Sequence, residues 1–328
     1  MATLVDLPIA ALNAADHRAD LARVAVIVPT CNAGPHWSAF SAALRSQAIP
    51  PGQVLLVDST SDDGTYELAE AEGFQVHRIE RREFNHGGTR QMALGMVPWA
   101  DIVVYLTQDA VLATPDAITQ LLAAFEDPAV AAAYGRQLPR PGAGPIETHA
   151  RLFNYPQQSD VRDYESRHRL GIKATFMSNS FAAYRIERLV DVGGFPSNTI
   201  LSEDAIVAGK LLLAGWKTAY VAEAEVYHSH RFTAAQEFRR YFDIGTLHAR
   251  EKWLMLEFGL PNGEGKRFVQ SELRHLARHD PWAIPSSCLR TLCKGAGYAL
   301  GKRESRLPQR LKAALAMNRS YWIHSNQP

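Results

Sequence analysis

An uninterrupted run of five apolar residues, Ile102–Leu106, constrains the fold of this chain more than any other feature. β-Branched residues dominate the run, and the polar residues Thr107, Gln108 and Asp109 follow it at once. Such a run predicts a strand buried on both faces of a parallel sheet. Open α/β sheets bind ligands beyond the carboxyl ends of their strands, so Asp109 is a candidate for reaching a hard metal ion and, through it, a diphosphate. Asp109 could equally end the strand or cap the following helix.

Similar apolar runs alternate with helix-like segments through the first half of the chain. In addition to 102–106, strands are predicted at 23–30, 53–58, 74–79 and 129–134, with helices at 35–47, 66–72, 85–96 and 115–126 between them. This alternation predicts an α/β fold with a Rossmann-like, mostly parallel central sheet flanked by helices. Candidate ligand-binding residues are expected along the edge where the strands end.

The second half of the chain is predicted to be irregular at first and then helical. Residues 135–171 are rich in Pro, Gly, Arg and His, which indicates a loop with short helical pieces that belongs to an acceptor site or a lid. Further strands are predicted at 176–184, 217–221 and 225–227, and further helices at 187–192, 202–214, 233–258, 264–279, 286–300 and 307–317. The chain then divides into a leader at 1–22, a catalytic α/β domain at 23–232 and a C-terminal helical appendage at 233–328.

Charge is distributed unevenly along the chain. The total is +1, which gives no argument for nucleic acid as a partner, but residues 285–328 hold eight Lys and Arg against one acid, Glu304. That segment therefore carries +7 and the rest of the chain −6. It could be a solvated basic face, or it could lie on an anionic membrane, where each basic residue contributes about 1 kcal/mol. Tyr298, Tyr321 and Trp322 could instead anchor a homo-oligomer interface.

Cysteine content and hydropathy suggest where the protein works. Three cysteines, none in a CxxC pair, provide neither a disulfide framework nor a zinc motif, and this fits a reducing compartment. The N-terminus lacks a basic-then-apolar signal region, and no apolar run approaches the roughly 20 residues of a membrane span. We therefore expect a cytoplasmic protein. It could also bind peripherally to the inner face of the cytoplasmic membrane.

Two further groups of residues have the chemistry of a catalytic site. Glu203 and Asp204 open a predicted helix, where the helix dipole favours the ionised form that a general base needs. His228 and His230 follow a predicted strand and could join a carboxylate in holding Mg²⁺ or Mn²⁺. The alternatives are helix capping for the two acids and hydrogen bonds to backbone for the two histidines.

Common nucleotide and hydrolase motifs are missing from the sequence. The turn after the first strand reads PTCNAGPHW, which lacks the GxGxxG fingerprint of dinucleotide-binding proteins. Neither a GxxxxGK[ST] phosphate loop nor a GxSxG nucleophile elbow occurs in the chain. The same turn has no Lys or Arg, which disfavours a nucleotidyltransferase.

Five segments in order resemble family 2 glycosyltransferases of the GT-A fold, and the bacterial rhamnosyltransferase branch most. They are VAVIVPTCN, VLLVDSTSDDGT, FNHGGTRQ, VVYLTQDA and GGFPSNTILSEDAIVAGKLLLAGWKTAYVAEAEVYHSH. The resemblance covers residues 23–258. Family members often carry DxD or DD at the metal motif, where this chain has Gln108-Asp109-Ala110.

The resemblance implies a role for each matching residue. Asp204 would be the general base, supported by Glu203. Asp109 and His228 would hold the metal ion, with His230 as an additional ligand. The nucleotide-sugar would be bound by residues on the strand ends and the third helix: Pro29, Thr30, Asn32, Asp58, Thr60, His86, Gly87, Gly88, Arg90, Gln108 and Asp109. Among them, Asp58 would contact the base, Arg90 the donor phosphate or sugar, and the two glycines would let backbone approach the ligand.

The resemblance also implies the reaction. Asp204 would remove a proton from an acceptor hydroxyl, which attacks the anomeric carbon of the donor and inverts it. The expected donor is dTDP-L-rhamnose, the cofactor Mg²⁺ or Mn²⁺, and the acceptor a glycan or lipid-linked glycan in cell-surface polysaccharide synthesis. A UDP-hexose donor remains open, as does a non-catalytic nucleotide-sugar or glycan-binding protein on this fold.

Overall fold

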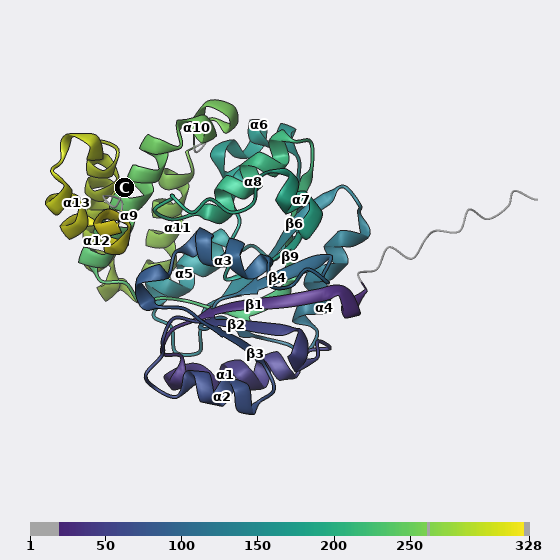
Figure 1. Cartoon of the computed structure of the whole chain (residues 1–328). Helices are drawn as coiled ribbons and strands as arrows, with labels where there is room; N and C mark the ends of the chain where they lie inside the picture. Colours follow the sequence, from purple (N-terminus) through teal and green to yellow (C-terminus); the bar gives the residue numbers. More distant parts are fainter. Residues whose placement is uncertain (1–19, 261–262, 325–328) are drawn as a thin grey trace, which may run out of the picture.

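The computed structural model describes residues 20–260 and 263–324, and its centre is a single twisted sheet (Figure 1). In the part described, the strand order is β3-β2-β1-β4-β8-β6-β9-β5, with β7 paired to β9. The strands are β1 Val24–Thr30, β2 Val54–Asp58, β3 Gln75–Arg78, β4 Ile102–Leu106, β5 Val111–Leu112, β6 Val130–Leu138, β7 Asp160–Arg162, β8 Phe181–Arg185 and β9 Lys217–Tyr227. Of the predicted leader at 1–22, residues 1–19 lie outside the described residues.

The sheet is parallel in its first half and mixed in its second. β3, β2, β1 and β4 run parallel, as the alternation of strands and helices predicts. β8 is antiparallel to both of its neighbours, β4 and β6, while β6 and β9 are parallel to each other. The two short antiparallel strands β5 and β7 both pair with β9. This mixed sheet places the ends of β4, β6 and β9 near one another on the candidate ligand side.

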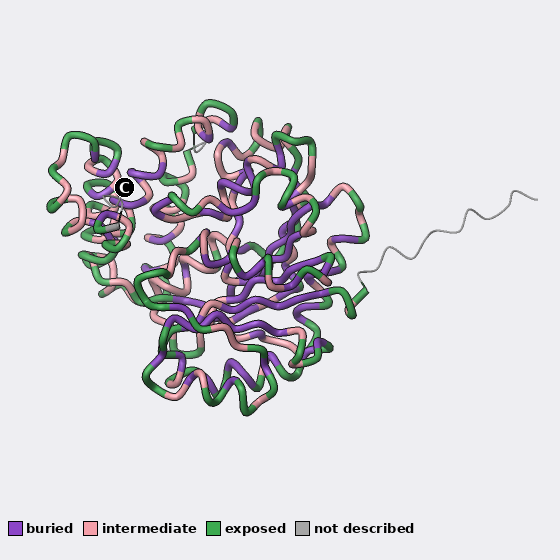
Figure 2. The backbone as a smooth tube through the Cα atoms, in the orientation of Figure 1, coloured by how far each residue is buried: buried purple, intermediate pink, exposed green. Residues whose placement is uncertain are grey.

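Helices cover both faces of the sheet because alternate strand residues point to opposite sides. Val24, Val26 and Val28 pack with α1 Gly34–Arg45, α2 Thr65–Ala71 and α4 Ala117–Leu122. Ala25 and Ile27 pack with α3 His86–Leu94, α7 Ile186–Asp191 and α8 Glu203–Leu213 on the other face. The buried backbone through the centre of the molecule in Figure 2 follows these strands, as expected for a sheet covered on both sides.

Several predicted elements differ from the structure. The strand predicted at 176–184 begins only at Phe181, and residues 176–180 before it are irregular or in a turn. The strands predicted at 217–221 and 225–227 form one strand, β9, whose register against β6 shifts at Gly135/Arg136 and so bridges the interruption. The helix predicted at 233–258 is divided at Glu251 into α9 Ala234–Arg250 and α10 Lys252–Phe258. The segment 135–171, predicted as a loop with short helical pieces, does contain helices, α5 Pro145–Asn154 and α6 Arg167–Leu170, but it also contains the end of β6 and the strand β7, which were not predicted.

The C-terminal helices form a group of their own beside α8. They are α9, α10, α11 Glu264–His279, α12 Ile284–Gly301, α13 Gln309–Leu315 and α14 Arg319–His324. Phe242, Phe258 and Trp322 form a buried core that also includes Ile206 of α8. α9 and α12 approach closely at glycines, since a Cβ atom on Gly301 would lie 2.1 Å from the carbonyl oxygen of Phe242. Within the described residues, no helix has both the length and the apolarity to cross a membrane.

Candidate active site

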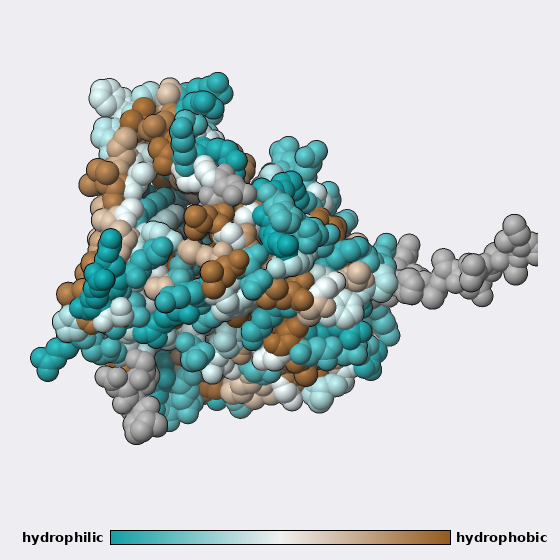
Figure 3. Space-filling model, turned by 90° about the horizontal axis from the view of Figure 1, so that it is seen from above, coloured by the Kyte–Doolittle hydropathy of each residue, from teal (hydrophilic) through white to brown (hydrophobic). Residues whose placement is uncertain are grey.

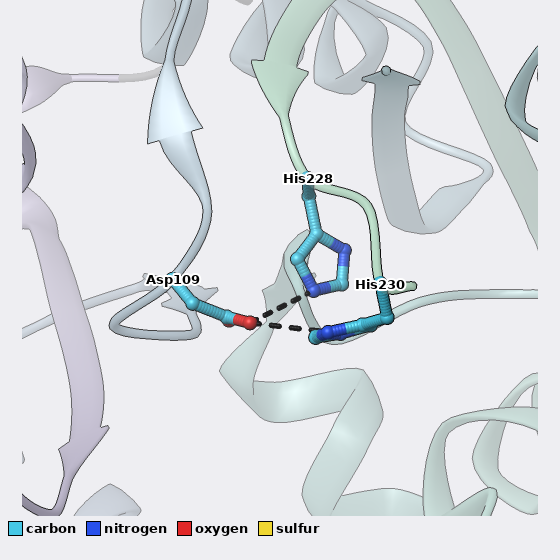
Figure 4. Close-up of side chains that lie close together, drawn as sticks. All are labelled: Asp109, His228 and His230. Atoms are coloured by element: carbon cyan, nitrogen blue, oxygen red, sulfur yellow. Dashed lines mark ion pairs between the residues drawn. The ribbon is translucent and has the colours of Figure 1, made fainter. Parts of the chain in front are cut away.

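Asp109, His228 and His230 converge at one end of the sheet (Figure 4). β5 pairs with β9 so that Val111 lies opposite Tyr227, and this brings the β4–β5 turn with Asp109 next to the residues that follow β9. The Asp109 Oδ2 atom lies 3.4 Å from His228 Nε2 and 3.5 Å from His230 Nε2. The three ligand-type atoms all lie within 4.8 Å of one another. A carboxylate and two imidazoles at this spacing can hold a divalent cation.

Gln137 fixes which nitrogen of His228 faces the cluster. The Gln137 Oε1 atom accepts a hydrogen bond from Arg151 and lies 3.0 Å from His228 Nδ1. An amide oxygen can only accept, so Nδ1 carries the proton and donates it. The Nε2 atom of His228 is therefore the nitrogen that faces the Asp109 carboxylate, and it is the atom that a cation bound at Asp109 would meet.

The groups around Asp109 favour its ionised form. Burial by itself would raise its pKa, but the hydrogen bond and charge of His228 and the charge of His230 lower the pKa well below its usual range. Arg140 donates to the main-chain oxygen of Asp109, and its guanidinium lies 3.7 Å from the carboxylate. Asp109 is therefore an anion at neutral pH, as a metal ligand must be. Arg140 would also favour the binding of a ligand that is itself negatively charged.

Glu203 and Asp204 start α8 but have different environments. Glu203 is buried and accepts hydrogen bonds from Arg90, at 2.9 Å, and from the side chain of Asn179, at 3.0 Å. Asp204 is half-buried and accepts from the backbone N–H groups of Asn179 and Ala205. Burial and the negative charge of Glu203 raise the pKa of Asp204 to about 7. The sequence argument from the helix dipole predicts the opposite direction, and it is outweighed here by desolvation and by the neighbouring charge.

A short segment before β8 joins the two groups. The side chain of Gln137, which orients His228, donates to Ser178 Oγ at 2.8 Å. The next residue, Asn179, binds Asp204 through its backbone and Glu203 through its side chain. The histidine–carboxylate cluster and the acid pair therefore share one scaffold. A carboxyl with a pKa of about 7 on the same scaffold as a candidate cation site could accept a proton from a hydroxyl that attacks a carbon atom and displaces a phosphorylated group from it.

The residues expected to bind the nucleotide lie at the ends of β1 and β2. Pro29 and Thr30 close β1, and Asn32 and Thr60 adopt positive φ angles of 52° and 54° in the loops that follow. Gln108 joins these loops to the metal loop, because its side-chain amide forms two hydrogen bonds with the backbone of Cys31, at 2.6 and 2.9 Å. Strained backbone of this kind clusters at ligand sites.

Asp58 is placed differently from what the resemblance implies. The resemblance suggests direct contact with the base, but the Asp58 side chain is fully buried. Its oxygens accept from the backbone and hydroxyl of Ser61 and from the hydroxyl of Thr30. The carboxylate thus shapes the loop after β2 in the described structure and presents no free oxygen to a ligand.

The start of α3 also differs from the expectation. Asn85 caps the backbone N–H groups of Gly87 and Gly88, so these donors already have a partner, and His86 beside them is exposed. A Cβ on Gly87 would lie 1.9 Å from the carbonyl oxygen of Pro196, so this glycine allows two protein segments to approach each other. Arg90 is 4% exposed and paired with Glu203, because an unpaired buried guanidinium would be costly. In the described structure the Arg90 guanidinium is therefore committed to its ion pair with Glu203.

The sequence analysis missed Gln137, Arg140, Arg151 and Asn179. The first three lie in the segment 135–171, whose content of Pro, Gly, Arg and His predicted a loop with short helical pieces. In the structure β6 continues to Leu138, and Gln137 is buried there. The concentration of arginine between 135 and 171 was the available signal for an anionic ligand.

Comparison with known proteins agrees with this geometry. Residues 102–269 match the family model for glycosyl transferase family group 2. The chain is 45% identical over 301 residues to the O-antigen chain rhamnosyltransferase RfbN of Salmonella typhimurium, covering 92% of this chain and 96% of that protein. It is also 45% identical over 298 residues to the O-antigen chain rhamnosyltransferase WbaN of Salmonella anatum, covering 90% of this chain and 95% of the relative.

Solved structures resemble the fold at low sequence identity. The mannosyltransferase PcManGT of Pyrobaculum calidifontis, in complex with GDP-Man and Mn²⁺, superposes with a TM-score of 0.52 at 21% identity, covering 92% of this chain and 85% of that chain. TarS 1–349 of S. aureus, in complex with UDP-GlcNAc, gives a TM-score of 0.55 at 17% identity, covering 90% of this chain and 84% of that chain. The fold is accordingly that of the GT-A glycosyltransferases. The chain is a glycosyltransferase that belongs to glycosyl transferase family group 2.

Proposed function

We propose that this enzyme transfers L-rhamnose from dTDP-L-rhamnose to a hydroxyl of a glycan acceptor, with inversion at the anomeric carbon. The observation that carries the proposal is the scaffold of Gln137, Ser178 and Asn179, which connects the candidate cation site to the candidate base. Two relatives at 45% identity, each matched over at least nine-tenths of both chains, are named as O-antigen chain rhamnosyltransferases. Their names favour rhamnose over a UDP-linked hexose.

Asp109, His228 and His230 fit a divalent metal ion. Their oxygen and nitrogen donors suit Mg²⁺ or Mn²⁺, and the tautomer that Gln137 imposes on His228 leaves a lone pair toward Asp109. When bound, such an ion supplies positive charge that stabilises a departing diphosphate. Arg140, which is anchored to the main chain of Asp109, adds a second positive group at the same place.

Asp204 is the proposed base. Its pKa of about 7 allows it to be ionised at neutral pH and to accept a proton with useful driving force. Glu203 has a supporting role, since its negative charge helps to raise that pKa and its own charge is balanced by Arg90. Thr30, Asn32, Thr60 and Gln108 border the site from the β1 side, where they would shape the nucleotide pocket around the donor.

We further infer that α12 rests on an anionic membrane surface, which would suit a lipid-linked acceptor. Trp282, just before the helix, is 92% exposed, and Leu289 and Leu292 on the helix are 55% and 72% exposed. Hydrophobic residues gather at the end of the molecule where the C-terminal helices lie (Figure 3). The basic side chains of Lys302, Arg303, Arg306 and Arg310 are exposed beyond the helix, and an apolar strip with basic neighbours is the pattern of an interfacial helix.

A vesicle experiment tests this contact. Wild-type protein should sediment with phosphatidylglycerol-containing vesicles more than with phosphatidylcholine vesicles, and Trp282→Ser/Leu292→Ser should reduce that binding. The matched control is Leu68→Ser/Leu213→Ser, which changes exposed leucines outside the C-terminal helices. Equal sedimentation of wild type and both variants would exclude α12 as the membrane contact.

Donor binding and transfer test the main proposal. Thermal unfolding is measured with dTDP, UDP and GDP, each with and without Mg²⁺ or Mn²⁺. A ligand that binds only the folded protein stabilises it by roughly 2.7 kcal/mol at a hundredfold excess over Kd. A metal-dependent shift with dTDP that is lost in Asp109→Asn and kept in the exposed control Asp116→Asn supports the site. Transfer of rhamnose should disappear in Asp204→Asn while donor binding stays. A larger shift with UDP would instead support a UDP-hexose donor, and turnover by Asp204→Asn would refute the base.

A further inference from the structure

A second basic cluster lies between α5 and α11, and none of its residues belongs to the candidate active site. Three histidines and two arginines line a pocket of about 480 Å³: His149 on α5, and Arg274, His275, Arg278 and His279 on α11. On α11 these residues recur at three- and four-residue spacing, so they share one helix face. That face is turned toward α5, which contributes Leu152 and Phe153 as the apolar wall of the pocket.

One ring nitrogen of His149, a residue that lines this pocket, has no hydrogen-bond partner among the described residues. Its side chain is almost completely buried, with an exposed fraction of 3%. Its Nε2 atom lies 2.9 Å from Ser271 Oγ, whereas its Nδ1 atom has no hydrogen-bond partner among the described residues. Buried nitrogens of this kind normally have a partner, because leaving one unsatisfied costs about 1–3 kcal/mol. A ligand with acceptor oxygens would supply that partner if Nδ1 carries the proton.

The positive groups of the pocket are not balanced by acids. No acidic residue is among its lining residues. The side chains of Arg274 and Arg278 are exposed and form no hydrogen bond or ion pair within residues 20–260 and 263–324. Burial, followed by the charges of His275 and Lys294, lowers the pKa of His149 to about 4, so His149 is neutral at pH 7 and the positive charge of the pocket comes from Arg274 and Arg278. An anion is the ligand that such a field attracts.

Two histidines on α11 lie against each other beside Arg274 and Arg278. The rings of His275 and His279 stack with their centres 4.2 Å apart. His279 Nδ1 lies 2.8 Å from the main-chain oxygen of His275 and therefore carries a proton toward it, which leaves its Nε2 for other partners. Two guanidinium groups one helical turn apart offer several N–H groups in a fork that matches the oxygens of a phosphate.

We propose that the pocket between α5 and α11 binds a phosphate or diphosphate group. Arg274 and Arg278 contact the oxygens, and His149, His275 and His279 close the site from the sides. The group could be free in solution or be the headgroup of an anionic lipid, since Trp282 is 92% exposed three residues beyond His279. The site is separate from the residues of donor and metal binding, so it does not depend on the proposed sugar transfer.

The first arm of the test uses phosphate in solution. Isothermal titration calorimetry of the full chain with inorganic phosphate and with diphosphate is performed in EDTA, which removes any metal-dependent binding. Arg274→Gln/Arg278→Gln is compared with Lys266→Gln/Arg267→Gln, a pair on the same helix with the same change in charge that does not line the pocket. We expect the first pair to weaken binding by about tenfold or more, as for the loss of a charge-assisted hydrogen bond, and the control pair to bind like wild type.

The second arm uses a lipid headgroup. The same three proteins are sedimented with phosphatidylcholine vesicles with and without phosphatidic acid. A defect of Arg274→Gln/Arg278→Gln in solution identifies a free phosphate site, and a defect confined to phosphatidic acid vesicles identifies a headgroup site. If the two double variants behave alike in both arms, the pocket does not recognise phosphate and the proposal is wrong. Because all four substituted side chains are exposed, loss of the fold does not confound the comparison.

Discussion

Replacing Asp204 by Asn should stabilise the protein at pH 8 while abolishing transfer. Burial and the charge of Glu203 raise the pKa of Asp204 to about 7, so the folded protein keeps this proton up to neutral pH. An unfolded chain releases it near pH 4. The folded state thus binds more protons between about pH 4 and 7, and stability falls as the pH rises through that window. Asparagine does not ionise, so the variant avoids the loss.

The magnitude follows from the size of the window. One pKa unit corresponds to about 1.4 kcal/mol, so the advantage of Asp204→Asn over wild type should grow by up to about 3 kcal/mol between pH 5 and pH 8. Asp243, another buried carboxyl whose pKa is raised to about 7, also titrates in this range. Its contribution is common to both proteins and cancels in the difference. In thermal unfolding the gain corresponds to about 5 °C in Tm.

The assay compares Tm of wild type, Asp204→Asn and Glu67→Gln at pH 5 and pH 8 at constant ionic strength. Glu67 is exposed in the first turn of α2 and serves as the control for loss of a carboxylate. We expect the pH-dependent gain in Asp204→Asn alone, together with loss of transfer at pH 8. If the difference in Tm between Asp204→Asn and wild type is the same at both pH values, the raised pKa of Asp204 is refuted.

Three other substitutions give independent tests. Glu203→Gln removes a negative charge that raises the pKa of Asp204, so the acid limb of the plot of kcat against pH should shift to lower pH by about one unit. An unshifted limb would show that Glu203 does not influence the group that titrates there. Gln137→Leu removes the hydrogen-bond acceptor of His228 and should weaken Mn²⁺-dependent donor binding about 10–100-fold. The control Gln137→Glu keeps an acceptor oxygen and should retain most of the donor affinity. An equal loss of affinity in both variants would contradict an orienting role for Gln137. Gly301→Ala should lower the free energy of unfolding in urea by about 1–3 kcal/mol, because its Cβ would lie 2.1 Å from the Phe242 oxygen at the α9–α12 contact. In the control Gly295→Ala, on the same helix, the new Cβ meets nothing within 4 Å, and the free energy of unfolding should rise by up to about 1 kcal/mol. A change of the same sign in both variants would contradict the close packing at Gly301.

Local patterns predicted the part of the site that lies directly at strand ends. Asp109 and His228 each follow an apolar run, and the carboxyl ends of the strands in such sheets carry the ligand site, so their approach could be expected before the structure. Glu203 and Asp204 were placed correctly at the start of a helix. Their electrostatics were not, because the pKa of a carboxyl depends on the charges and solvent around it, and these come from other segments of the chain.

The sequence patterns did not reveal which residues have partners far away in the chain. The motif around Gly87 and Arg90 resembles a ligand-binding loop, yet their partners are Pro196 and Glu203, more than a hundred residues later. Gln137 was assigned to a loop, although its side chain contacts His228, Arg151 and Ser178. A polar side chain in a short apolar context gives no sign of which remote group it will bind.

Most of the strands, the helices between them and the family could be predicted from the sequence, because apolar periodicity and motif order are properties of consecutive residues. The tertiary structure decided that β8 runs antiparallel, that β5 pairs with β9 and so brings Asp109 to His228, and that Gln137 selects the tautomer of His228. It also placed five basic side chains around one pocket between α5 and α11. These features depend on pairing between segments far apart in the chain, where the free energy comes from packing and hydrogen bonds that no local pattern records.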